Sequence, residues 1–172
     1  TNNASSGTVA LDVASDLSVT GTVATGTASV DGTGNAVSGE IEIDDLTNIS
    51  GAGTLQTGDV DGTGSTGITR GGDILIGTTT AVDGDIDAIT ITLADAEGNA
   101  GSSTFGGDLE IVADGQLAST DGVTVNLGGS VGGAGQTARS STAEISVEGV
   151  GSFTTSDDIT APDVELTINA KN

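Results

Sequence analysis

The chain of 172 residues carries 25 acidic and 3 basic residues, which gives a formal net charge of −22 at pH 7. A charge of this size repels nucleic acid phosphates and anionic membranes, and it argues against both as partners. The chain has no cysteine, so disulfides and thiol chemistry are excluded. It also has no histidine, so a serine or threonine nucleophile would lack its usual base, and we expect no enzymatic activity.

The first long pattern is an alternation of apolar and polar side chains over residues 7–23. The odd positions hold the apolar residues Val9, Leu11, Val13, Leu17, Val19 and Val23. A period of two predicts a strand with one buried face. Ordinary strands run about five or six residues. The segment therefore predicts an unusually long N-terminal strand, which either pairs within its own domain or reaches into a neighbouring subunit.

Two stretches of the chain, residues 21–43 and residues 53–76, resemble each other. The matching pieces, in order, are 21–26 with 53–58, 30–34 with 60–64, and 39–43 with 72–76. An ordered set of three matches predicts a structural repeat.

The remaining sequence is rich in Val, Ile and Thr, is punctuated by Gly and Asp, and shows no helical apolar stripe. This composition predicts an all-β fold, with hairpin turns at Asp-Gly pairs between apolar runs. These pairs are Asp31-Gly32, Asp61-Gly62, Asp83-Gly84, Asp114-Gly115 and Asp121-Gly122. We favour a β-sandwich or jelly-roll-like subunit, in which residues 1–14 form an N-terminal donor strand and residues 15–172 a single β domain. A β-solenoid is the alternative, because it explains the repeat.

Alternating carboxylates are the motif closest to a ligand site. Asp59-x-Asp61-Gly62 looks like the start of a calcium loop, although Arg70 stands where the closing Glu would be. A second alternating set is Asp83, Asp85 and Asp87. These five aspartates are the candidate metal ligands, with calcium as the ion, and ordinary Asp-Gly turns are the competing explanation.

Two further triplets match the N-glycosylation sequon. Asn3 and Asn48 each stand two residues before a serine, as Asn3-Ala-Ser5 and Asn48-Ile-Ser50. They become candidate glycosylation sites if the source organism glycosylates its surface proteins.

Gly/Thr/Asp-rich strands, absent cysteine and scarce lysine resemble the secreted prokaryotic surface proteins of biofilm-matrix fibres, bundling pili and S-layers. Among these, the TasA-like and archaeal bundling filaments are similar in having a sandwich or jelly-roll subunit that lends a terminal strand to its neighbour. The large repetitive adhesins resemble the solenoid alternative. The resemblance spans the whole chain and is one of composition.

The resemblance implies a structural subunit of an extracellular filament, pilus or matrix fibre that assembles with copies of itself by β-strand addition. The alternative is a calcium-dependent adhesion or S-layer module of the cell surface, with cations or glycans as partners. For the filament, the expected subunit interface consists of Val9, Leu11, Val13, Val164, Leu166 and Ile168.

Overall fold

The computed structural model describes residues 3–78, 80–82, 86, 89–98, 103–113, 124–126, 130–131, 138–139, 142–147 and 165–170. All regular secondary structure in these residues is strand, so the all-β prediction is confirmed. The strands that pair within this part of the chain all run parallel. No helix long and apolar enough to cross a membrane occurs in the described residues.

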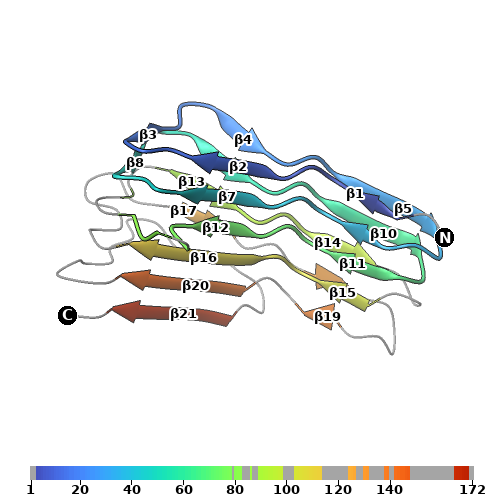
Figure 1. Ribbon diagram of the computed structural model, residues 1–172. Helices are drawn as coiled ribbons and strands as arrows, with labels where there is room; N and C mark the ends of the chain where they lie inside the picture. Colours follow the sequence, from blue (N-terminus) through green and yellow to red (C-terminus); the bar gives the residue numbers. More distant parts are fainter. Residues whose placement is uncertain are drawn as a thin grey trace.

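The chain passes repeatedly through the same sequence of strand positions, and we call each passage a rung (Figure 1). The first rung consists of β1 (Ala4–Ser5), β2 (Val9–Asp12), β3 (Leu17–Ser18), β4 (Thr22–Ala24) and β5 (Ala28–Gly32). The second consists of β6 (Ala36–Val37), β7 (Ile41–Asp44), β8 (Ile49–Ser50), β9 (Thr54–Gln56) and β10 (Val60–Ser65). Hydrogen bonds between successive rungs join residues 30 to 37 positions apart.

The later rungs follow the same path. The third contains β11 (Ile68–Arg70), β12 (Ile74–Ile76), β13 (Thr90–Thr92) and β14 (Ala96–Gly98). The fourth contains β15 (Ser103–Phe105), β16 (Asp108–Ala113), β17 (Thr124–Asn126) and β18 (Ser130–Val131). The remaining strands are β19 (Ala138–Arg139), β20 (Thr142–Val147) and β21 (Glu165–Ala170).

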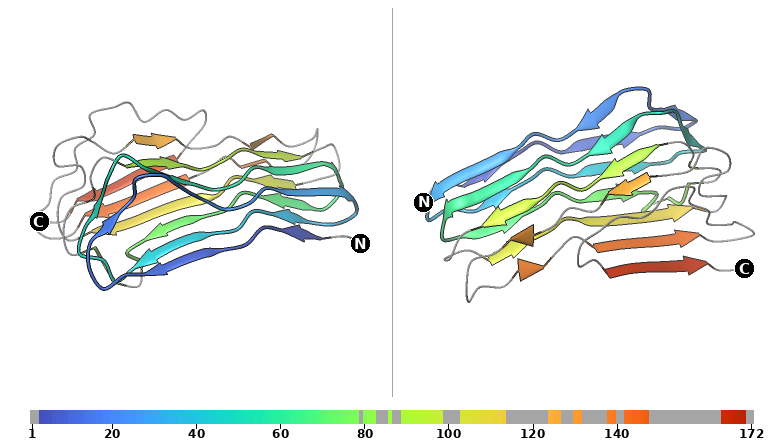
Figure 2. Two further views of the ribbon diagram at one scale, coloured as in Figure 1. Left: turned by 90° about the horizontal axis from the view of Figure 1, so that it is seen from above. Right: turned by 180° about the vertical axis from the view of Figure 1, so that it is seen from behind.

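Stacking of the rungs builds two pairs of facing sheets (Figure 2). The wider pair consists of β2-β7-β12-β16-β20-β21 and β4-β9-β13-β17, with the short sheet β3-β8 at its closed end. The narrower pair consists of β1-β6-β11-β15-β19 and β18-β14-β10-β5. We call the wider pair the body and the narrower pair the arm.

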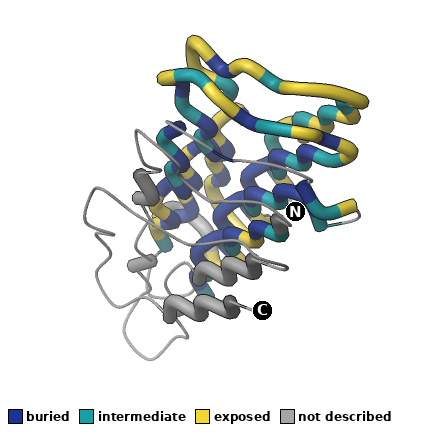
Figure 3. Tube along the Cα trace, turned by 90° about the vertical axis from the view of Figure 1, so that its left-hand side faces the viewer, coloured by how far each residue is buried: buried dark blue, intermediate teal, exposed yellow. Residues whose placement is uncertain are grey.

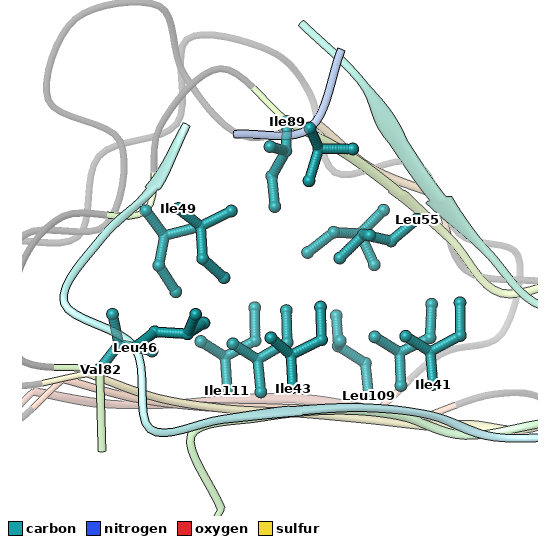
Figure 4. Packing of buried hydrophobic residues seen from close by; sticks show 14 of the residues in the cluster. Ile41, Ile43, Leu46, Ile49, Leu55, Val82, Ile89, Leu109 and Ile111 are labelled. Atoms are coloured by element: carbon teal, nitrogen blue, oxygen red, sulfur yellow. The ribbon is translucent and has the colours of Figure 1, made fainter. Parts of the chain in front are cut away.

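The body encloses the main hydrophobic core (Figure 4). Alternate residues of each strand face inward, and in β7 and β12 these are isoleucines. Ile41 pairs in register with Ile74, and Ile43 with Ile76, so identical side chains stack from rung to rung. All four are fully buried. β-branched residues pack well on a pleated surface, which explains why this sequence forms strands here.

The arm is thinner because its inward residues are small. Its core cluster consists of Ala28, Val30, Ala36 and Val60, with Ala4 packed against it. At one point the two arm sheets approach so closely that a Cβ at Gly62 would overlap Oγ1 of Thr69. Body and arm meet at a waist, where Oγ of Ser38 and Oγ1 of Thr25 lie 3.2 Å apart and share a hydrogen bond.

The expectation of one long N-terminal strand is wrong. Residues 7–23 form three short strands, β2, β3 and β4, which belong to three different sheets. The chain turns a corner between them, yet the apolar side chains stay on the inner side throughout. The alternation of apolar and polar residues indicates which side chains face inward, but it does not indicate where the chain changes direction.

The expected hairpins at Asp31-Gly32 and Asp61-Gly62 are also wrong. Asp31-Gly32 ends β5, and the next strand, β6, lies in a different sheet, while Asp61-Gly62 lies inside β10. At the tip of the arm the chain crosses between facing sheets, and Gly32 supplies the positive φ of 99° needed there. The other three Asp-Gly pairs lie outside the described residues.

The two sequence repeats lie side by side, with a difference in one piece. Thr22 pairs with Thr54, and Ile41 pairs with Ile74, as the sequence matches align them. In the middle piece, however, Val60 faces Ala28, and the register shifts between Asp61 and Gly64. The β-bulge at this place raises the offset between paired residues from 32, the value of the first piece, to 33, the value of the third.

Candidate functional site

The first rung leaves one edge of each sheet that it joins without a partner in the described chain. In the largest sheet this edge is β2. Val9 N–H donates to the Glu40 carbonyl at 2.8 Å, and Val13 N–H donates to the Asp44 carbonyl at 3.2 Å. Backbone groups alternate in direction along a strand, so those of Ala10 point away from β7. We call β2 with its outward backbone groups the N-terminal edge.

Side chains at this edge are less buried than their counterparts one rung later. Val9 and Leu11 are half-buried, whereas Ile41 and Ile43, their partners in register, are fully buried. Val13 is half-buried as well and packs against the same core. Figure 3 shows the exposed residues gathering at its upper end, where the corner of the first rung lies. The edge is therefore a place where the core is incompletely covered.

The expected interface residues fall at the two ends of one sheet. Val9 and Leu11 belong to β2 at one end, and Leu166 and Ile168 belong to β21 at the other. Residues 1–14, expected as a donor strand, include β2, which pairs with β7 of its own chain. Exchange of this segment between subunits stays a prediction. Val164 lies outside the described residues.

Strand pairing brings acidic residues together on the outer face of the arm. Asp61 of β10 pairs with Glu97 of β14, and these two residues line a cavity of about 260 Å³ together with Asp59 and Asp95. Thr63 holds the Asp61 carboxylate in place, because its N–H and its Oγ1 donate to Oδ1 at 2.9 and 2.6 Å. These hydrogen bonds, the side-chain one first, lower the pKa of Asp61. We call this group the arm carboxylates.

Of the five expected metal ligands, Asp59 and Asp61 thus share a cavity, while Asp83, Asp85 and Asp87 lie outside the described residues. Within the described residues, no three Asp or Glu side chains are grouped closely enough to hold a metal ion. The sequence interpretation missed Asp95 and Glu97. The available signal was the repeat, since one rung after Asp59-x-Asp61 the chain again carries two acids with the same spacing.

A second polar cavity of about 410 Å³ lies at the waist, lined by Ser5, Ser38, Glu40, Arg70 and Asp73 among others. Arg70 Nη2 lies 3.0 Å from Oδ2 of Asp73 and 3.7 Å from Oδ2 of Asp108, so its positive charge partly neutralises these two carboxylates. The pKa of Glu40 is raised, chiefly by burial and then by Asp73 and Glu42, although Arg70 opposes the shift. Arg70 therefore connects successive rungs electrostatically.

The two asparagines of the sequons differ in their surroundings. Asn3 is exposed, and its Oδ1 accepts a hydrogen bond from the Asn35 N–H at 3.0 Å. Asn48 is half-buried, and its Nδ2, the atom that a glycan would occupy, donates to Oδ1 of Asp16 at 2.8 Å. Both side chains join neighbouring rungs, and glycosylation of either stays a prediction.

No known protein family, no curated protein and no solved structure matches the chain.

Proposed function

We propose that the protein is a non-catalytic structural subunit of an extracellular filament, and that copies of it join by β-strand addition. We further propose that the stacked rungs make it a β-solenoid. The observation that carries the proposal is the N-terminal edge, where the outer side of β2 has no strand partner among the described residues and the core beside it is half-covered. Backbone groups at such an edge supply affinity, and alternate side-chain positions supply register.

A single added strand is insufficient for stable assembly. Completing the burial of the half-buried Val9 and Leu11 contributes about 1 kcal/mol each, because full burial of such side chains is worth about 1.5–3 kcal/mol. Association costs at least about 4 kcal/mol in lost freedom of motion. The proposed contact therefore extends over the other edges of the first rung. The net charge of −22 on each copy opposes association. Assembly therefore requires salt of about 0.15 M, at which the repulsion between copies is screened beyond about 8 Å.

Substitution of Ala10 by proline tests the proposal. Proline removes the outward N–H at the N-terminal edge without removing the Val9 N–H bond to Glu40, and proline is tolerated on edge strands. We expect the unmodified chain to form filaments in electron micrographs and Ala10→Pro to remain monomeric with a normal circular dichroism spectrum. Ala10→Thr, which keeps the N–H, should assemble normally. A chain that stays monomeric in screened solution at high concentration would refute the filament role.

The arm carboxylates favour a second candidate function, a calcium-dependent adhesion module. Two pairs of acids on neighbouring strands, Asp59 with Asp61 and Asp95 with Glu97, line one cavity, where a bound calcium ion would have to draw a third carboxylate closer than it lies in the structure. Calcium binds oxygen ligands of this kind and tolerates irregular geometry. A cation between them would also relieve the repulsion of like charges across the strands.

Calcium bound only to the folded chain should increase the free energy of unfolding by about 2.7 kcal/mol when the free calcium concentration is about a hundred times the dissociation constant. The melting temperature should rise accordingly. Thermal melts in millimolar calcium, in chelator and in sodium chloride of equal ionic strength measure this. Asp59→Asn should abolish the gain, while Asp31→Asn, which removes the same charge outside the cavity, should keep it. Equal melting curves in calcium and in matched sodium chloride would eliminate a specific site.

A further inference from the structure

Glycines of the first rung differ from the glycines stacked on them. They head three columns of residues in register: Gly7 with Gly39, Gly72 and Gly107; Gly21 with Gly53 and then Ile89; and Gly26 with Gly58 and then Ala94. The first member of each column is exposed, and all later members are buried. The columns lie at the corner before β4 and on both sides of the waist.

Each later glycine of these columns is required for a steric reason. A Cβ at Gly39 would overlap the carbonyl of Gly7, and a Cβ at Gly72 would overlap the carbonyl of Gly39. Gly107, Gly58 and Gly53 meet the carbonyl of the preceding column member in the same way. The rungs approach so closely at these glycines that there is no room for a side chain.

The first members have no such reason within the part of the chain that the structure describes. Among the described residues, a Cβ at Gly7 or Gly21 would meet no atom within 4 Å, and one at Gly26 would meet only Cβ of Ser6, at an ordinary 3.5 Å. None of the three has a positive φ. Glycine becomes necessary at these positions once another rung lies on the first rung at the same spacing.

We infer that a rung of a second copy of this chain covers the first rung, in a parallel head-to-tail arrangement. This inference rests on the proposed filament function and specifies its contact. In the sheet that ends in β2 and β21, Leu166 and Ile168 pair in register with Ala143 and Ile145. The pairings that connect the two ends place Leu166 in the same column as Val9, and Ile168 in the same column as Leu11.

β21 of one copy therefore fits beside β2 of the next copy, and this contact continues the pairing between successive rungs that already exists inside the chain. Aliphatic positions meet aliphatic positions, and every pairing keeps the parallel direction of the described strands. An edge-to-edge contact between two copies of β2 would be antiparallel and would not continue the glycine columns.

Adding methyl groups to the first-rung glycines tests the inference. The triple variant Gly7→Ala, Gly21→Ala, Gly26→Ala should fold with an unchanged or higher melting temperature, because the single chain has room for each Cβ. It should nevertheless form no filaments where the unmodified chain does. A control triple on exposed positions of the same rung, Ser15→Ala, Ser18→Ala, Thr20→Ala, should assemble normally. Normal assembly of the glycine triple would overturn the inference and leave the filament role standing.

Engineered cysteines test the direction of stacking, since the chain has none of its own. In head-to-tail register Thr167 of one copy faces Ala10 of the next, at the close spacing of paired strands that a disulfide can bridge. Oxidation of the double variant Ala10→Cys, Thr167→Cys should give a ladder of covalent oligomers on a denaturing gel. Ala10→Cys alone should give no covalent dimer. A dimer from the single variant, or filaments of the double variant without a ladder, would contradict this arrangement.

Discussion

Replacing Ile76 by alanine should destabilise the chain by about 2–5 kcal/mol, the usual range for truncating a fully buried isoleucine. Ile76 has no exposed surface and lies between Ile43 and Ile111 in the stacked column. Removing its outer carbon atoms leaves a cavity in the centre of the body, where packed neighbours on both sides prevent collapse. For a chain of this length, such a loss should lower the melting temperature by at least about 4 °C.

Ile68→Ala is the matched control for this substitution. Ile68 is 47% exposed and is the exposed large hydrophobic residue of the described chain. Its truncation should change the free energy of unfolding by less than about 0.5 kcal/mol. Urea denaturation followed by far-ultraviolet circular dichroism measures both variants. Similar losses for the two isoleucines would contradict the assignment of Ile76 to the core.

The inward faces of the strands could be predicted from the sequence, because burial and alternation are local properties. Val9, Leu11 and Val13 were expected on one face, and all three pack against the main core. Strand direction could not be predicted in the same way. An Asp-Gly pair such as Asp31-Gly32 serves a hairpin and a crossing between facing sheets equally well, since both need a residue with positive φ.

Rung-to-rung pairing is a long-range property, and only the repeat pointed to it. The match of 39–43 with 72–76 aligns Ile41 with Ile74, which is the register of the structure. The match of Val30 with Val60 does not, because Val60 pairs with Ala28, two residues before Val30. Because this pairing is long-range, the proximity of Asp59 and Asp95 could be found only after the length of a rung was known.

Gly72→Ala should destabilise the folded chain by about 1–3 kcal/mol or more, the cost of inserting a group where the packing has no space. The new Cβ would overlap the carbonyl oxygen of Gly39 and would lie 3.0 Å from Oγ of Ser38. Both atoms belong to the waist, whose hydrogen bond between Ser38 and Thr25 keeps the two sides together. The rungs would have to separate locally, and the hydrogen bonds between them would lengthen.

Gly7→Ala occupies the same column and is the control, because its Cβ would point into open space. Its effect should be a gain of about 0.4–1 kcal/mol from the lower entropy of the unfolded chain, or no change. Both variants are measured as monomers, at low ionic strength where charge repulsion opposes assembly. The difference between them isolates the contact made by an overlying rung, because the substitution and the column are the same. Equal effects at the two positions would mean that close packing of rungs does not explain the glycine columns.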